Sequence, residues 1–225
     1  MASIGKGVIF LILFLLWWAY VIIGMLVFKA VENHAEREDY YYRHEWNYGD
    51  SFWFVVVLLT TIGYGDFTPV TSLGKSLCVV YAFFGIPITI LLFKVIGQQM
   101  LQGERSLIKT IEKRFLGRNG APSCLNEKCL LLAIVYFLFL LLIGAAAHMK
   151  AEGWSYRDGL YFYAITFTTV GFGDLIPHKE RYITVPFILL GLNAISNVMH
   201  AAAALTLIKR VTSGSKEREN GEAEV

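Results

Sequence analysis

Two copies of one short glycine-rich string are the residues of this chain whose types and spacing could do chemistry. The first copy, TTIGYGD, begins at Thr60, and the second, TTVGFGD, begins at Thr168, 108 positions later. Main-chain oxygens of consecutive residues can replace the water shell of an alkali cation when they point the same way. That arrangement needs alternating backbone conformations, some of them left-handed, which glycine adopts freely. The strings therefore predict two loops that coordinate cations through their backbone.

The residues around the predicted left-handed positions fit the same chemistry. These positions fall on the four glycines of the two strings, Gly63, Gly65, Gly171 and Gly173. Thr61 and Thr169 add a side-chain oxygen at the inner end of each loop. Ile62 and Val170 are β-branched and stiff, which suits a side chain wedged behind a narrow passage.

The outer ends of the two strings resemble each other less closely. Asp66 and Asp174 lie just outside the glycines, where they can raise the local concentration of cations. Tyr64 can form a hydrogen bond through its hydroxyl, and Trp53 is the partner that we expect for it. The second string has Phe172 in place of Tyr64, so a matching bond must be built differently there.

Composition indicates a membrane protein and argues against several other classes. Of 225 residues, 56% are hydrophobic and only 17% are charged, against about 25% charged in soluble domains. The net charge of +2 is too small to indicate a nucleic-acid partner. Three cysteines without framework spacing predict no disulfide scaffold, and Cys124 and Cys129 are expected to be free thiols. No metal cluster or catalytic constellation appears, so we expect no enzyme.

Four apolar stretches are long enough to cross a bilayer, which takes about 20 residues. They cover residues 7–28, 76–93, 129–149 and 182–208. The connection between the second and third stretch carries seven basic residues, more than any other connection. By the positive-inside bias, this connection and both termini are cytoplasmic, and both glycine strings lie on the outer side. We expect a multi-pass protein of the plasma membrane.

A repeated unit organises the chain. Residues 46–69 align with residues 154–177 without a gap, and ten of 24 positions are identical. The apolar stretches 52–59 and 160–169 are too short to cross and are typical of re-entrant half-helices. Because the units share one topology, they are parallel copies rather than inverted ones. The predicted parts are two pore repeats, a basic cytoplasmic linker and a disordered tail, at residues 1–100, 129–210, 101–128 and 211–225.

Two copies of T-x-G-[YF]-G-D in a four-span chain resemble the two-pore-domain potassium channel family, from about residue 7 to 210. The resemblance implies an all-α membrane protein with the order span, pore loop, span, span, pore loop, span. It implies a homodimer whose four loops form a pseudo-tetrameric pore, with the second and fourth spans lining the inner cavity. The ion-binding residues that it implies are Thr61, Ile62, Gly63, Tyr64, Gly65, Thr169, Val170, Gly171, Phe172 and Gly173. Potassium is then the transported ion, and no organic cofactor is expected.

The chain departs from that family between the first span and the first pore loop. Family members carry a long extracellular helical cap there, often with a cysteine bridge between subunits. Here the connection from Lys29 to Asp50 has 22 residues and no cysteine. A full cap cannot fit, so we expect a dimer that depends on transmembrane contacts. The charged run from Glu32 to Glu45 is either a short helix or a solvated loop.

Several polar and flexible positions keep two interpretations each. Asn193, Asn197 and His200 share one face of the fourth span and either line the cavity or bond to other helices. Gly85, Pro87 and Gly191 mark either hinges or static bends. The predicted outer-side histidines are pH sensors or ordinary surface residues: His34, His44, His148 and His178. The basic linker either contacts anionic lipid of the inner leaflet or is a solvated helix end.

The favoured function is a potassium-selective leak channel, because no span carries the regular arginines of a voltage sensor. Heterodimers with related subunits remain open. A non-conducting subunit that modulates such a channel, a subunit of a potassium transporter and a weakly selective cation channel are the alternatives.

Overall fold

The computed structural model describes residues 2–33, 46–115, 124–179 and 181–223, and within these ranges it contains helices and no strand. The helices are α1 (Ala2–Asn33), α2 (Tyr48–Leu59), α3 (Ser72–Phe115), α4 (Leu125–Ala151), α5 (Tyr156–Phe167) and α6 (Arg181–Ala223). The all-α prediction is confirmed for the described part of the chain. The charged run that begins at Glu32 lies mostly outside these ranges.

Four of these helices are long and apolar enough to cross a membrane. Their candidate spans are Gly7–Glu32, Ser72–Arg114, Leu125–Ala151 and Arg181–Thr206. All four predicted stretches are therefore found, and each lies in its own helix. The helices are longer than the stretches because charged residues such as Lys, Arg and Glu extend a helix well once it has begun.

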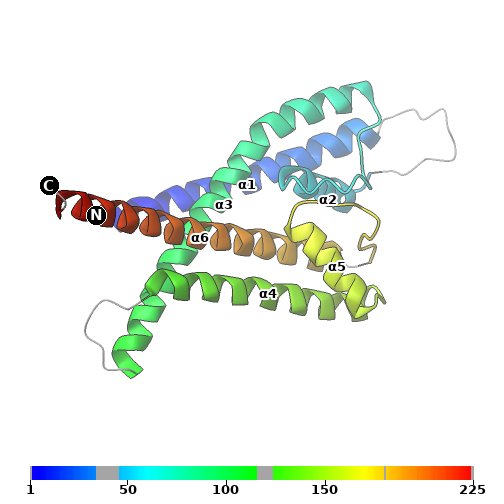
Figure 1. Ribbon diagram of the computed structural model, residues 1–225. Coiled ribbons are helices and arrows are strands. Elements are labelled where there is room, and N and C mark those ends of the chain that lie inside the picture. Colours follow the sequence, from blue (N-terminus) through cyan, green and yellow to red (C-terminus); the bar gives the residue numbers. More distant parts are fainter. Residues whose placement is uncertain (1, 34–45, 116–123, 180, 224–225) are drawn as a thin grey trace.

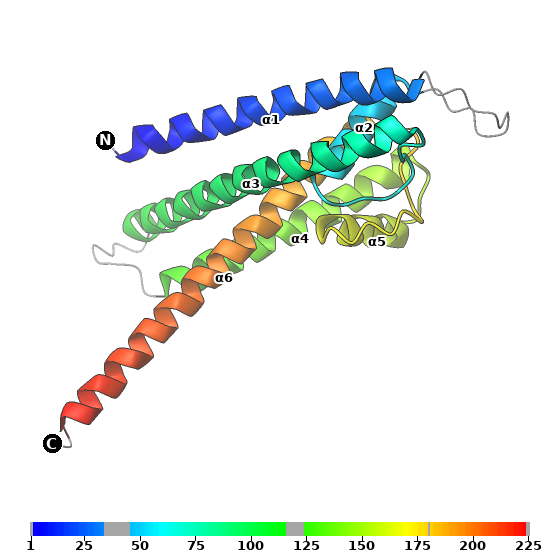
Figure 2. The same cartoon turned by 90° about the horizontal axis from the view of Figure 1, so that it is seen from above.

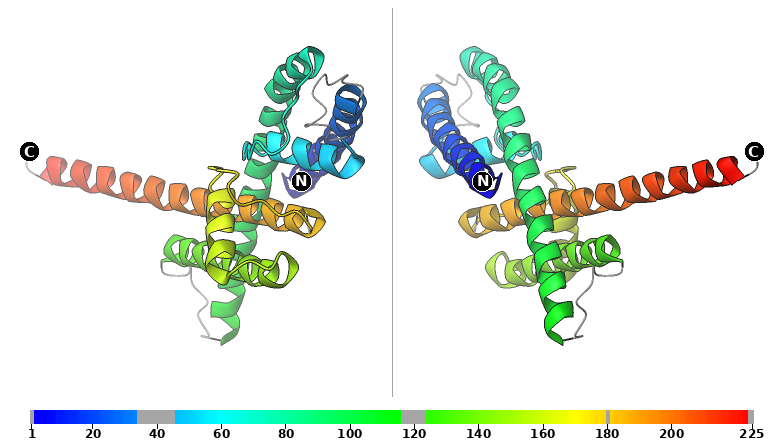
Figure 3. Two further views of the ribbon diagram at one scale, coloured as in Figure 1. Left: turned by 90° about the vertical axis from the view of Figure 1, so that its right-hand side faces the viewer. Right: turned by 90° about the vertical axis from the view of Figure 1, so that its left-hand side faces the viewer.

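The helices are arranged as two similar halves (Figure 1). In the first half α1 packs along α3 and covers α2, and in the second half α4 packs along α6 and α5. Contacts between α3 and α6 join the halves. The short helices α2 and α5 lie at one end, whereas the N-terminus and the C-terminal end of α6 lie at the other (Figure 2). Views along the bundle show α2 and α5 beside each other near the centre (Figure 3).

The two half-helices begin at matching caps. The Asn47 side chain accepts a hydrogen bond from the Asp50 amide (2.9 Å), and Ser155 Oγ accepts one from the Asp158 amide (3.2 Å). Each cap satisfies an amide that the first turn leaves unpaired, and each aspartate favours the positive end of the helix dipole. The predicted half-helices are confirmed, and both begin earlier than the apolar pattern indicated.

Two predicted segments differ from the structure. Residues 101–115 of the predicted linker continue α3 as helix, and residues 211–223 of the predicted disordered tail continue α6. Composition alone indicated solvated chain in both places. Adding a residue to an existing helix avoids the cost of nucleation, so a polar segment directly after a long span can stay helical.

The proposed hinge positions are sites of close packing. A Cβ atom on Gly85 would lie 2.3 Å from Leu59 Cδ2, and one on Gly191 would lie 2.1 Å from Phe167 Cε1. Both glycines let a long helix approach the end of a pore helix. Pro87 lies inside the continuous helix α3.

Replacing Gly191 by alanine is expected to destabilise the fold, because the buried Phe167 ring has no room to move away from the new methyl group. Overpacking of this kind costs about 1–3 kcal/mol. The check is thermal unfolding in detergent micelles, followed by fluorescence-detected size exclusion. G103A is the matched control, since Gly103 is also helical and a Cβ there meets nothing within 4 Å. An equal melting temperature for G191A and wild type would contradict this packing.

Candidate functional site

The two glycine strings fold into loops with the same alternating backbone. Their φ angles are positive at Gly63 (65°), Gly65 (82°), Gly171 (54°) and Gly173 (74°), as the sequence predicts. Thr61 (59°) and Thr169 (58°) are also left-handed, which the sequence analysis did not anticipate. A left-handed threonine stores roughly 1–3 kcal/mol of strain, and such strain persists only where surrounding contacts hold it.

Each loop is anchored to the end of its own pore helix by a matching set of backbone hydrogen bonds. The amides of Ile62 and Gly63 both donate to the Val57 carbonyl, at 3.1 and 3.3 Å. In the second repeat, the amides of Val170 and Gly171 donate to the Ile165 carbonyl at 3.0 and 3.2 Å. The repeat seen in the sequence therefore extends to individual hydrogen bonds.

The loops lie side by side, with the glycines of the second against the carbonyls of the first. A Cβ atom on Gly171 would lie 2.2 Å from the Ile62 carbonyl oxygen. A Cβ atom on Gly173 would lie 2.2 Å from the Tyr64 carbonyl oxygen. Only glycine permits this approach.

The glycines of the first loop have no such neighbour in a single copy of the chain. A Cβ atom on Gly63 or Gly65 would meet nothing within 4 Å. Gly171 is buried, whereas its counterpart Gly63 is exposed. The glycine edge of the first loop is thus open, although the same edge of the second loop is covered.

The side chains behind the loops show the opposite imbalance. Ile62 and Tyr64 of the first loop are 3% and 7% exposed. Their counterparts Val170 and Phe172 are 48% and 65% exposed. The first loop packs its side chains against α5 of the second repeat, and the second loop has no pore helix of this chain behind it.

The Tyr64 hydroxyl lies 2.5 Å from Thr166 Oγ1 on α5. The prediction that Trp53 bonds to this hydroxyl is wrong, because the two rings stack at 5.7 Å and the Trp53 indole nitrogen donates to Asp66 at 2.8 Å. In the second repeat, the Tyr161 hydroxyl donates to Asp174 at 2.9 Å. A side chain of each pore helix therefore holds the aspartate that follows its own loop.

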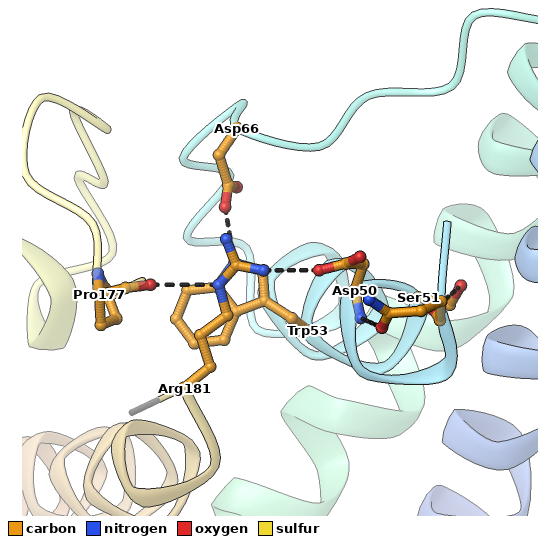
Figure 4. Close-up of polar contacts among 7 residues, drawn as sticks. Asp50, Ser51, Trp53, Asp66, Pro177 and Arg181 are labelled. Carbon is orange, nitrogen blue, oxygen red and sulfur yellow. Dashed lines mark hydrogen bonds and ion pairs between the residues drawn. The ribbon is translucent and has the colours of Figure 1, made fainter. Parts of the chain in front are cut away.

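Arg181, at the start of α6, joins the two repeats behind the first loop. Its guanidinium donates to Asp50 on α2 (2.7 Å) and to the Pro177 carbonyl (3.1 Å). It also lies over the Phe67 ring, 4.9 Å from the centroid. Figure 4 shows the Asp66 carboxylate pointing toward the same guanidinium. Sequence analysis missed this residue, because the first repeat has no basic counterpart.

A glutamate from each preceding span holds the chain just after each loop. Glu32, only 3% exposed, accepts hydrogen bonds from the Val70 amide and the Thr71 hydroxyl at 3.0 and 2.7 Å. Glu152 accepts from the His178 and Lys179 amides at 3.2 and 2.8 Å. The bonded segments occupy equivalent places in the two repeats. The gap-free alignment did not pair the glutamates, since the connections before the pore helices differ in length.

A cavity of about 570 Å³ lies at the inner end of the loops. Its lining includes the threonines of both loops together with residues of α3 and α6: Thr60, Thr61, Thr168, Thr169, Thr89, Ile90, Phe93, Leu192, Ile195, Met199 and His200. The second and fourth spans thus line it, as the sequence analysis expected.

The asparagines of the fourth span are not among the lining residues. Asn197 is fully buried, and its amide donates to Glu104 of α3 at 2.6 Å. Asn193 donates to the Leu189 carbonyl of its own helix at 2.7 Å. Of the three residues on that face, only His200 lines the cavity. A helical pattern places residues on one face, but that face is wide enough to meet both a cavity and a neighbouring helix.

The predicted outer-side histidines have unlike surroundings. His148 is fully buried, with its ring nitrogens 2.7 Å from Thr184 Oγ1 and 3.0 Å from the Tyr163 hydroxyl. His178 is exposed. His34 and His44 lie outside the described residues. Cys124 and Cys129 are free thiols, as predicted.

Replacing Arg181 by glutamine is expected to lower the stability of the outer end by about 3 kcal/mol, because Asp50 loses its cation in a largely buried place. The measurement is thermal unfolding in detergent. R181K should fall between wild type and R181Q, since lysine keeps the charge but not the planar fork. K179Q removes an exposed neighbouring cation and serves as control. Equal effects of K179Q and R181Q would refute the role of Arg181.

Comparison with known proteins agrees with this architecture. The model of a family described as "Ion channel" matches residues 8–102 and 130–207, which include both loops. The human potassium channel subfamily K member 16 is 35% identical over 157 residues, covering 65% of this chain and 49% of that protein. The mouse potassium channel, subfamily K, member 16 is 33% identical over 170 residues, covering 71% and 56%. The chain spans about half the length of the curated relatives it matches. With its doubled pore unit inside the matched ranges, the chain belongs to the ion channel family and, within it, to the two-pore-domain potassium channels.

Proposed function

We propose that two copies of this chain form a potassium-selective leak channel. The observation that carries the proposal is the pair of complementary open edges in one copy. The first loop leaves Gly63 and Gly65 uncovered, and the second leaves Val170 and Phe172 uncovered. Inside the chain, the covered versions of these same edges face each other. A second copy related by a two-fold axis would cover both edges and close a ring of four loops.

The proposed chemistry is exchange of hydration for backbone oxygens. In the closed ring, the carbonyls of Thr61 to Gly65 and of Thr169 to Gly173 replace the water shell of a potassium ion. Asp66 and Asp174, which stay exposed, keep the outer mouth negative. The cavity at the inner end supplies hydrated ions from the other side. The anchors to Val57 and Ile165 hold the loops at one spacing.

The mode of gating and the location follow from the spans. No candidate span carries a regular series of arginines, so the channel conducts without a voltage sensor of that kind. The concentration of basic residues between the second and third spans places both termini in the cytoplasm of a cell whose plasma membrane holds the channel. Dimers with related subunits would need the same complementary edges.

Replacing Gly63 or Gly171 by alanine is expected to abolish potassium current. Alanine disfavours the left-handed backbone at both positions by roughly 1–2 kcal/mol, and at Gly171 the methyl group would also meet the Ile62 carbonyl 2.2 Å away. The measurement is two-electrode voltage clamp over a series of external potassium concentrations. G103A, on an open helix face, is the control for expression. Selective current of normal size in either filter variant would remove the assignment.

The same recordings separate the alternatives. A reversal potential that follows the potassium gradient supports the channel, whereas one that follows sodium equally supports a weakly selective pore. Absence of current from wild-type chain at the cell surface supports a modulatory subunit. Substrate-coupled currents that saturate with potassium support a transporter.

Mixing wild-type and G171A chains tests the number of subunits. If two chains form one pore, equal expression should leave about a quarter of the wild-type current, because only pure wild-type dimers conduct. Surface biotinylation gives the amount of each chain. Half of the current remaining would indicate that each chain conducts alone, and would contradict the proposed dimer.

A further inference from the structure

Phe172 is the large side chain of the second loop that one copy of the chain leaves uncovered, at 65% exposed. Its counterpart Tyr64 is almost completely buried. The inference below concerns what covers Phe172, and it rests on the proposed function, because it requires the second copy.

The contact of Tyr64 inside the chain serves as a template. The Tyr64 ring stacks between Trp53 of its own pore helix (5.7 Å) and Phe162 of the neighbouring pore helix (5.9 Å). Its hydroxyl reaches Thr166 on that neighbouring helix at 2.5 Å. The seam between the first loop and the second pore helix is therefore closed by a hydrogen bond between two side chains.

The equivalent seam between copies has different chemistry. In the repeat alignment Phe172 replaces Tyr64, and Leu58 of α2 replaces Thr166. Both partners of the hydrogen bond are thus absent together: one lacks its hydroxyl and the other is aliphatic. Removing both partners of a buried bond costs little, whereas removing one leaves a polar group unpaired. The paired change is what a contact between these two residues requires.

Leu58 has surface available for such a contact. Its neighbours Val57 and Leu59 on α2 are 4% and 1% exposed, while Leu58 itself is half-buried. One copy of the chain thus presents an exposed aromatic ring on one edge and a partly exposed leucine at the position that would face it.

We propose that Phe172 packs on Leu58 of the partner subunit, so that the four-loop ring has two kinds of seam. The seams within each chain are polar, formed by Tyr64 and Thr166. The seams between chains are apolar, formed by Phe172 and Leu58. The surface selects a partner with an aliphatic side chain at this position of its first pore helix, and a second copy of this chain is that partner.

The test uses the full-length chain and a double-mutant cycle with the variants F172Y, L58T and F172Y/L58T. F172Y places a hydroxyl against leucine methyl groups, and we expect potassium conductance per surface channel to fall about tenfold. The double variant recreates the polar pair and should return to within about twofold of wild type, although each change alone impairs the channel.

The combination F172Y/T166L is the control for pairing within the chain. It should be no better than F172Y, because the proposal places Thr166 opposite Tyr64 and not opposite residue 172. Rescue by T166L, or a double variant F172Y/L58T no better than the product of its single variants, would overturn the proposal. Wild-type chain without potassium current would instead refute the proposed function.

Cross-linking keeps the inference testable if a variant fails to conduct. Chains without their three native cysteines are made with either L58C or F172C, carry different tags, and are expressed together. A short bis-methanethiosulfonate reagent should link the two tags covalently. The pair Y64C/T166C calibrates the reach of the reagent and should link only within one chain. Absence of the L58C–F172C product, where the calibration pair reacts, would contradict the proposed seam.

Discussion

The constraint on which the structure depends is the left-handed backbone at alternate positions of two short loops. At Thr61 and Thr169 that conformation is strained, so the loops cannot hold it alone. Each amide pair that follows the threonine donates to one carbonyl near the end of a pore helix. The pore helices are in turn fixed by their caps and by the long apolar helices around them. Strain in a few residues is thus distributed over the whole bundle.

The outer ends of the loops are held by charged side chains from several helices. Trp53 and Tyr161 fix the aspartates after the glycines, and Glu32 and Glu152 fix the segments beyond. Arg181 connects the first pore helix to the second repeat. These groups surround the backbone from outside, which leaves the main-chain oxygens available to an ion.

Periodicity and repetition were enough to predict the four spans, the two pore helices and the left-handed glycines. They could not predict contacts that depend on which helix meets which. Tyr64 was assigned to Trp53 because the two are close in sequence, whereas its hydroxyl bonds to Thr166 of the other repeat. Asn197 was placed on a possible cavity face, but Glu104 from a neighbouring helix meets it first. Glu32, Glu152 and Arg181 lacked a signal, because their partners are backbone groups or lie far along the chain.

The central claim is that main-chain oxygens from four loops, two from each copy, surround a potassium ion on a two-fold axis. An electron cryomicroscopy map of the full-length chain in lipid nanodiscs with potassium tests this most directly. The account predicts a column of ion density on the axis between two copies, with the first and second loops alternating around it. Loops that face lipid, or a central axis without bound ions, would contradict it.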